Sequence, residues 1–190
     1  MFRDVGFRVS AGETLALEGP NGSGKSSLLR MIAGFLAPVA GTIRIRMKCG
    51  EDISDPEERG KLVGWLGHHD AAKPQLTPRE TLRFFAKLNG SEANQAEDGI
   101  DATLDEVGLG RAHDLPCQYL SAGQKKRLAL ARLKMSARPL WLLDEPLAAL
   151  DADGKKLAAD FIKAHCAAGG IALVATHETL GVDSARLALA

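Results

Sequence analysis

The sequence feature that most constrains this chain is a glycine-rich segment near its start, Gly19-Pro20-Asn21-Gly22-Ser23-Gly24-Lys25-Ser26. The segment fits the pattern G-x-x-x-x-G-K-[ST]. The apolar residues 14–17 precede it as a predicted strand, and residues 27–33 follow it as a predicted helix without a breaker. A strand, a glycine-rich loop and a helix are the context in which this pattern holds phosphate. An ordinary turn has no need of Lys-Ser at the helix start, so we interpret the segment as a phosphate-binding loop in an α/β protein.

The residue types of this loop suit a polyphosphate. Glycines have no Cβ, so their N–H groups can approach phosphate oxygens, and the following helix start adds unpaired N–H groups and a partial positive charge. We expect Lys25 to place its ammonium between the β- and γ-phosphates, and Ser26 to ligate Mg²⁺ through its hydroxyl. The predicted phosphate-binding residues are Gly19, Pro20, Asn21, Gly22, Ser23, Gly24, Lys25, Ser26 and Ser27.

Composition limits the classes of protein to which the chain can belong. Its 190 residues suit one domain, and 45% hydrophobic with 25% charged residues is ordinary for a soluble globular protein. The net charge of zero argues against a broad nucleic-acid surface, so we expect no nucleic-acid partner. The three cysteines lack metal-ligand spacing, and no apolar run approaches membrane-spanning length. We expect a cytoplasmic protein that acts at a membrane only through a partner.

The order of predicted elements indicates one α/β domain interrupted by helices. Residues 139–143 form a continuous apolar run, as expected for a central parallel strand covered on both faces. Residues 2–9 alternate like a half-buried antiparallel strand. Within a single domain spanning residues 1–190, we assign 1–70 and 131–190 to the α/β core and 71–130 to a helical insertion. Further strands are predicted at 14–18, 42–45, 61–66 and 171–175, a polar surface segment at 51–60, and further helices at 78–88, 100–107, 119–133 and 154–168.

Two carboxylates follow the predicted central strand. Open α/β sheets bind ligands at the carboxyl ends of their strands, so Asp144 is placed to hold Mg²⁺. Glu145 can orient or deprotonate an attacking water. Taken alone, the pair could equally be an exposed acidic turn. His177 follows another predicted strand in the same way, so we expect it near the γ-phosphate, although a lone histidine at a strand end is more often structural.

The segment Leu120-Ser121-Ala122-Gly123-Gln124 has two interpretations. Ser-x-x-Gln before a helix is a capping box. A helix N-terminus with a hydroxyl and a small glycine is also an anion site. Because the segment belongs to the helical insertion, we expect it to be too far away to reach its own phosphate loop. In the second interpretation it would serve the nucleotide of another subunit.

Together these motifs resemble those of the ATP-binding cassette (ABC) ATPases, and the resemblance covers nearly the whole chain. Five separated motifs agree with the family in their order. They are the Walker A loop at 19–26, the LSGGQ signature at 120–124 with Ala122 in place of the first glycine, Walker B at 140–144 with Glu145 as the catalytic glutamate, the D-loop at 148–151, and the switch histidine His177.

The resemblance implies a fold, an activity and an assembly. The fold is that of a P-loop NTPase, with a RecA-like core, a mostly parallel sheet, N-terminal antiparallel strands and an inserted helical subdomain. The activity is hydrolysis of ATP with Mg²⁺. The assembly is a head-to-tail homodimer with ATP between Walker A of one subunit and the signature of the other. The implied residues are Lys25, Glu145 and His177 for catalysis, Ser26, Asp144 and His69 for the metal, and Ser121, Ala122, Gly123, Gln124 and Asp151 beside the phosphate loop for nucleotide binding.

Two positions depart from the family pattern. The family usually has a glutamine at the strand end before the insertion, where this chain has His68 and His69. We favour His69 as the equivalent, with His68 as the alternative, and an imidazole there would add a pH dependence that glutamine lacks. The chain also starts too late to supply the family's usual adenine-stacking aromatic. Phe2 or Phe7 is the alternative for that role, but we expect both to lie in the core.

Within the family, the chain looks like the haem-exporter ATPase of the bacterial cytochrome c maturation system. This similarity rests on residues 2–7, 66–71 and 76–84 and on the compact length. It implies integral-membrane permease subunits and haem-handling maturation proteins as partners, at the cytoplasmic face of the cell membrane. The alternatives are the ATPase of an exporter for a drug, lipid or ion, a soluble ABC ATPase of DNA repair or translation, and a non-catalytic nucleotide-binding regulator.

Overall fold

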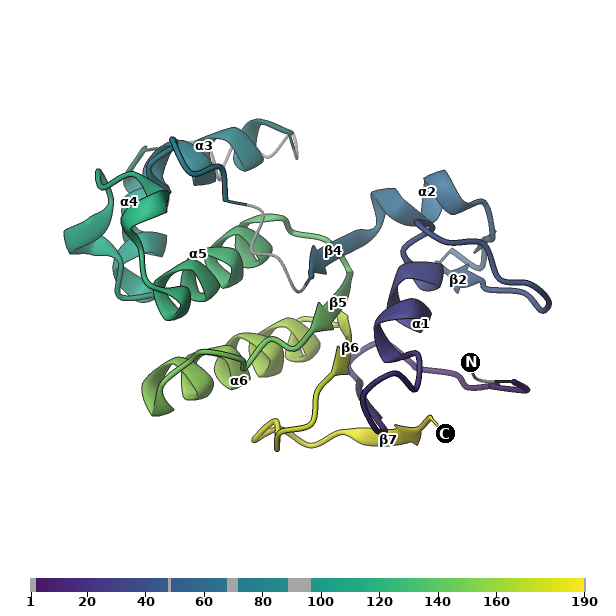
Figure 1. Cartoon of the computed structure of the whole chain (residues 1–190). Coiled ribbons are helices and arrows are strands. Elements are labelled where there is room, and N and C mark those ends of the chain that lie inside the picture. The colour runs from purple at the N-terminus through teal and green to yellow at the C-terminus, as the bar shows by residue number, and fades with distance from the viewer. Residues whose placement is uncertain (1–2, 48, 68–71, 89–96, 190) are drawn as a thin grey trace.

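The centre of the structure is a five-stranded sheet with the strand order β4-β5-β6-β1-β7 (Figure 1). The computed structural model describes residues 3–47, 49–67, 72–88 and 97–189. Every pairing in this sheet is parallel, so the carboxyl ends of the strands share one edge. The strands are β1 (Thr14–Glu18), β4 (Val63–Leu66), β5 (Leu140–Asp144), β6 (Ile171–Ala175) and β7 (Ala185–Ala188).

Helices cover both faces of this sheet. Figure 1 shows α1 (Lys25–Ile32) on one side of the strands, and α5 (Ala122–Met135) and α6 (Ala152–Ala167) on the other. The residues of β5 alternate between the two layers, because Leu140 and Leu142 pack with α1 while Trp141 and Leu143 pack with α5 and α6. All residues of β5 are buried, which confirms the predicted central strand.

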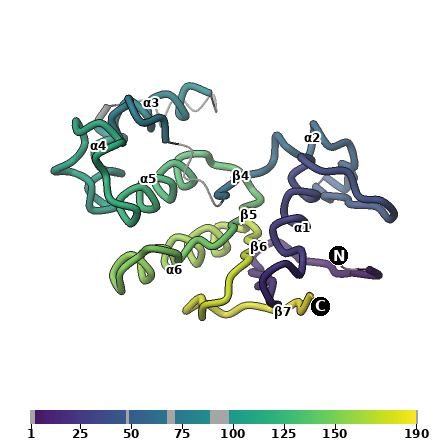
Figure 2. Tube along the Cα trace, viewed as in Figure 1, coloured from purple at the N-terminus to yellow at the C-terminus, as the bar shows by residue number. Residues whose placement is uncertain are grey.

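A helical lobe stands beside the sheet and carries the signature segment (Figures 1 and 2). α3 (Pro78–Leu88), α4 (Glu97–Glu106) and α5 pack against one another, and the short turns η2 (Gly110–Ala112) and η3 (Cys117–Tyr119) lead from α4 to α5. α5 also contacts β4 and continues past residue 130. The predicted boundary between insertion and core therefore falls inside one helix, and the division into two parts stays a prediction.

The N-terminal segment does not form the strand predicted at 2–9. Residues 3–10 have no ladder partner, although Val5 and Val9 pack partly against the apolar layer around α1. The alternating pattern therefore reflects contact with the core and not strand pairing. Antiparallel pairing is found instead between β2 (Ile45–Arg46) and β3 (Asp52–Ile53).

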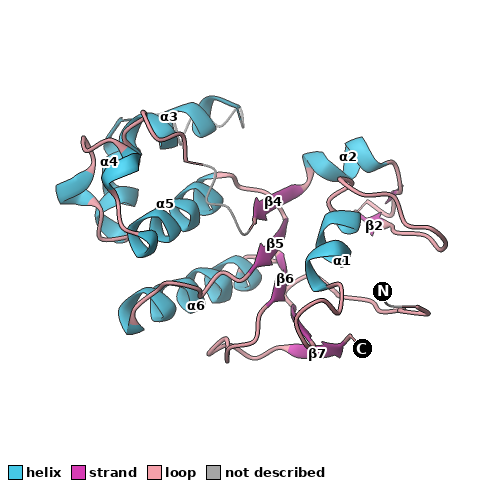
Figure 3. Cartoon of the chain, in the orientation of Figure 1, coloured by secondary structure: helices cyan, strands magenta, loops and turns pink. Residues whose placement is uncertain are grey.

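The peripheral elements α2, β3 and β7 were not predicted from the sequence, and Figure 3 labels α2 and β7. α2 (Pro56–Lys61) occupies the polar segment, and the Asp55 carboxylate caps it by accepting hydrogen bonds from the N–H groups of Glu57 and Glu58. β7 extends the sheet beyond β1. Among the residues that the structure describes, no helix is both long and apolar enough to cross a membrane.

Candidate active site

Three segments with predicted chemical roles start at one edge of the sheet. Leu17 of β1 and Asp144 of β5 both pair with Ala175 of β6, so the three strands end at the same level. The glycine-rich loop follows β1, Asp144 closes β5, and His177 comes two residues after β6. Their meeting at one sheet edge is the arrangement that open α/β sheets use for ligand sites.

The backbone of the glycine-rich loop has a positive φ at three of its glycines, Gly19, Gly22 and Gly24. Gly19 has φ 149°, and a Cβ there would lie 2.3 Å from the Leu189 carbonyl oxygen. Gly24 has φ 100°, in the left-handed region, where it begins α1. Lys25 is 8% exposed, and its Nζ donates to the carbonyl oxygens of Gly19 at 2.7 Å and Pro20 at 3.1 Å. The ammonium group is therefore folded over the loop.

The second residue of α1 contacts the last residue of β5. Ser26 Oγ donates a hydrogen bond of 2.9 Å to Asp144 Oδ1, and Asp144 is buried. The contact passes over the end of β6, which separates β1 from β5. Hydroxyl and carboxylate oxygens are ligands that Mg²⁺ prefers, so this pair can hold a phosphate-bound cation.

Glu145 and His177 form a second pair at the same edge. The Nδ1 atom of His177 lies 3.2 Å from Oε1 of Glu145 and 3.1 Å from Oε2, and the hydrogen bond goes to Oε1. Because a carboxylate only accepts, Nδ1 carries a hydrogen, and an imidazole that carries a second hydrogen on Nε2 can donate from that side as well. Glu145 is mostly covered, at 21% side-chain exposure, whereas His177 is 68% exposed. A carboxylate that can act as a base therefore lies beside an accessible imidazole.

The signature segment forms the predicted capping box at the start of α5. Ser121 Oγ accepts from the Gln124 N–H at 3.2 Å, and the Gln124 side chain accepts from the Ser121 N–H at 2.9 Å. A Cβ on Gly123 would lie 2.8 Å from the Ala149 carbonyl oxygen, so this glycine allows close contact with the loop after β5. A capping box leaves other first-turn N–H groups unpaired, so it is compatible with anion binding.

Asp151 is engaged within its own chain. Its Oδ1 accepts from the Gly154 N–H at 2.9 Å, which caps α6, and from Arg127 Nη2 at 2.6 Å. The Gly154 N–H, followed by the Arg127 guanidinium, lowers the pKa of this carboxyl. Arg127 therefore joins α5 to the start of α6. Sequence reasoning missed this residue, because a basic side chain on a helix carries no signal of its partner.

Two further predictions concern the histidines at 68 and 69 and the phenylalanines near the start of the chain. His68 and His69 lie outside the described residues, and so does Phe2. Phe7 is 40% exposed, so the prediction that it lies in the core is wrong. The physical reason is that residues 3–10 form no strand, and no sheet face is available to cover its ring.

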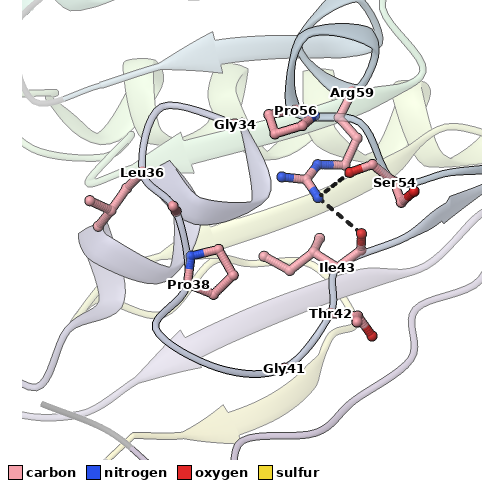
Figure 4. A pocket seen from close by; sticks show the side chains of 10 residues that line it. Gly34, Leu36, Pro38, Gly41, Thr42, Ile43, Ser54, Pro56 and Arg59 are labelled. Carbon is pink, nitrogen blue, oxygen red and sulfur yellow. Dashed lines mark hydrogen bonds between the residues drawn. The ribbon is translucent and has the colours of Figure 1, made fainter.

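A hollow of about 260 Å³ lies at the carboxyl end of α1, and its lining includes no residue of the glycine-rich loop (Figure 4). Arg59 on its wall is 4% exposed and donates to the carbonyl oxygens of Ile43 at 2.9 Å, Ser54 at 3.0 Å and Met31 at 3.1 Å. Burial lowers the pKa of this guanidinium. Arg59 thus ties three backbone segments together, which is a structural role.

The fold and the site define a P-loop nucleotide-binding protein of the α/β class. The sequence profile described as "ABC transporter" matches residues 2–148. The chain therefore belongs to the ABC transporter family, and it is one of the ATPases of that family.

Curated relatives and solved structures agree with this assignment. The cytochrome c biogenesis ATP-binding export protein CcmA of Paramagnetospirillum magneticum is 46% identical over 98% of this chain and 85% of its own length. The protein of the same name from Mesorhizobium japonicum is 44% identical over 98% of this chain and 89% of its own length. A solved ATP-binding subunit of an ABC transporter is 29% identical with a TM-score of 0.81, covering 93% of this chain and 72% of that one. The bacterial ABC transporter cassette MJ0796, solved as a dimer, is 25% identical with a TM-score of 0.78, covering 93% and 80%.

Proposed function

We propose that this ATPase powers an export complex of cytochrome c biogenesis, where it drives haem export or the release of a haem-loaded chaperone. Support comes from relatives that are named as ATP-binding export proteins of cytochrome c biogenesis and that match almost the whole chain. The observation that carries the catalytic part is the meeting of the glycine-rich loop, Asp144, Glu145 and His177 at one sheet edge.

The chain's own residues suggest how ATP is held. Lys25 exchanges its bonds to the loop carbonyls for the β- and γ-phosphates, because a polyphosphate is a stronger acceptor for an ammonium group. Ser23 is 7% exposed, and its Oγ has no hydrogen-bond partner among the residues that the structure describes. A buried hydroxyl without a partner is costly, and a phosphate oxygen would satisfy it. The backbone N–H groups of residues 19 and 21–27 complete the cradle.

Ser26 and Asp144 fit a magnesium ion. Their oxygens are already in contact at 2.9 Å, and both are hard ligands. When bound, Mg²⁺ would neutralise charge on the phosphates. His69, or its neighbour His68, is the further candidate for a metal-bound water.

Glu145 and His177 are the proposed catalytic pair. Glu145 orients the attacking water and accepts its proton, and the imidazole that Glu145 aligns reaches the γ-phosphate. The aligned imidazole stabilises charge on the departing phosphoryl group. Hydrolysis then removes the γ-phosphate that holds the site closed.

We further propose a head-to-tail homodimer. Ser121, Ala122, Gly123 and Gln124 would close over the ATP of the partner subunit, as in the family pattern, and Asp151 would hold the D-loop beside it. The signature begins α5, and α5 lies on the opposite side of the sheet from α1, the helix that follows the phosphate-binding loop (Figure 1). This arrangement supports a role for the signature at the nucleotide of a partner subunit. Integral-membrane permease subunits would dock near residues 68–74, of which 68–71 lie outside the described residues, and the chain would act at the cytoplasmic face of the membrane.

Co-purification tests the proposed partners. We would express the Glu145→Gln form in the native host, solubilise membranes with ATP present, and identify the recovered proteins by mass spectrometry. Recovery of cytochrome c maturation proteins is the expected result, with the Lys25→Ala form, which loses phosphate binding, as the control. Recovery of an unrelated permease would overturn the cytochrome c assignment and leave the ATPase chemistry standing.

A further inference from the structure

The loop that carries His177 is tied to α6 by an ion pair. Lys155 lies in the first turn of α6, and its Nζ pairs with the carboxylate of Glu178. Glu178 directly follows His177 in the chain. The ion pair therefore acts one residue away from the imidazole that contacts Glu145.

The residue before His177 is fixed as well. Thr176 is 3% exposed at the end of β6, and its Oγ1 accepts the Glu178 N–H at 3.0 Å. The backbone is thus held on one side of His177 by burial and on the other by a hydrogen bond and an ion pair. Because the His177 side chain is 68% exposed, packing does little to fix it, and its position depends on this backbone.

We propose that Lys155 is a positioning residue for ATP hydrolysis. By holding Glu178, it keeps the His177 imidazole against Glu145 in the arrangement that the reaction needs. The inference rests on the proposed roles of Glu145 and His177. A small displacement of a catalytic group from its working position slows the chemical step. Loss of the ion pair should therefore slow hydrolysis, whereas nucleotide binding at Lys25 and Ser26 should not change.

The position of Lys155 gives this ion pair a wider role. The same turn of α6 is capped by Asp151, which pairs with Arg127 of α5. One helical turn therefore contacts both the signature helix and the loop of His177. Contacts of α5 and of the His177 loop therefore meet at the start of α6.

Steady-state kinetics of the full chain test the proposal. In Lys155→Met we expect kcat to fall about tenfold while KM for ATP stays within about twofold, as for loss of positioning in the transition state. Glu178→Gln removes the other partner and should give the same change, and the double variant should be no slower than either. Lys155→Arg keeps the charge and should keep kcat. Lys134→Met is the matched control, because Lys134 has the same 42% exposure and pairs with Glu106 away from the site.

A double-mutant cycle with His177→Ala decides how Lys155 acts. If Lys155 acts through the imidazole, Lys155→Met adds no further loss of kcat in the His177→Ala background. An unchanged kcat in Lys155→Met, or an equal loss in both backgrounds, would overturn the proposal. Such an ion pair contributes little to stability, so unfolding midpoints should stay close to wild type. Failure of the wild-type chain to hydrolyse ATP would instead count against the proposed function.

Discussion

Glu145 is fixed by its backbone as well as by its side chain. Its φ of 50° lies in the left-handed region, which costs a non-glycine residue about 1–2 kcal/mol. Its N–H donates to the Ala175 carbonyl oxygen at 2.8 Å, which continues the pairing of β5 with β6 by one residue. This turn takes the carboxylate out of the line of the strand and sets it beside His177.

Replacing Glu145 by glutamine should separate binding from hydrolysis. Glu145→Gln keeps the size of the side chain and removes the base, so we expect the hydrolysis rate to fall by about a hundredfold or more. ATP binding should remain, because Lys25 and Ser26 are unchanged, and an ATP-bound dimer should accumulate. A phosphate-release assay and size-exclusion chromatography with ATP measure both effects. Rapid turnover by this variant would contradict the assigned role.

His165 is a titratable group outside the site that influences stability. Its ring stacks on Trp141 with 3.9 Å between centroids and 5° between planes, and Nε2 lies 3.2 Å from the Ile171 carbonyl oxygen. Burial lowers the pKa of this imidazole from its ordinary value of 6.5. In the folded chain the neutral form is therefore favoured more strongly than in the unfolded chain.

The free energy of unfolding should consequently fall as the pH drops below about 6.5. In that range His165 takes up a proton more readily in the unfolded chain than in the folded chain. The free energy of unfolding therefore keeps falling until the pH reaches the lowered pKa that His165 has in the folded chain. One proton limits this slope to about 1.4 kcal/mol per pH unit. Urea unfolding between pH 7.5 and 5.5 measures it. His165→Asn should flatten the dependence, and an unchanged slope in this variant would refute the assignment.

Among the elements, those with a strong local signal could be predicted from the sequence. Strands were predicted at 139–143 and 171–175, where β5 and β6 lie, and a helix at 78–88, where α3 begins behind a capping box of Thr77 and Glu80. β7 is short and mostly exposed, so it lacked such a run. α2 is polar throughout, and the only signal for it was Asp-Pro at its start.

The motif residues of the site could be identified from the sequence, but the contacts between their side chains could be predicted only in part. A shared metal role predicted that Ser26 and Asp144 would meet, and they do. The contact between Glu145 and His177 depends on strand order, because β6 adjoins β5, and strand order cannot be read from separate motifs. The partners of Arg127 and Lys155 lie 24 and 23 residues away along the chain, and periodicity carries no information on such side-chain contacts.

The contact between α5 and the loop after β5 gives a prediction at the scale of elements. In Gly123→Ala, the new Cβ would lie 2.8 Å from a backbone oxygen of Ala149, so the helix start or the loop must shift. We expect kcat to fall at least about tenfold, and the free energy of unfolding to drop by about 1–3 kcal/mol. ATPase assays and urea unfolding measure these effects. Ala122→Gly, one position earlier, is the control and should remain close to wild type; equal behaviour of the two variants would contradict the steric argument.

At the scale of the whole molecule, one short loop connects two functional surfaces. It leaves β5 at Glu145, passes Ala149 beside the signature helix, and ends at Asp151 on α6. The carboxylate proposed for catalysis and the surface proposed to meet a partner's ATP are therefore parts of one continuous structure. This arrangement suits an ATPase whose cycle of closing and opening drives a membrane partner.

Restoration of cytochrome c maturation tests the central claim most directly. In the native host with the gene deleted, we would return either the wild-type chain or Lys25→Ala at equal expression, and detect covalently bound haem in c-type cytochromes by haem staining. The account predicts that the deletion strain lacks these cytochromes, that the wild-type chain restores them, and that Lys25→Ala does not. Normal c-type cytochromes in the deletion strain or in the Lys25→Ala strain would contradict it.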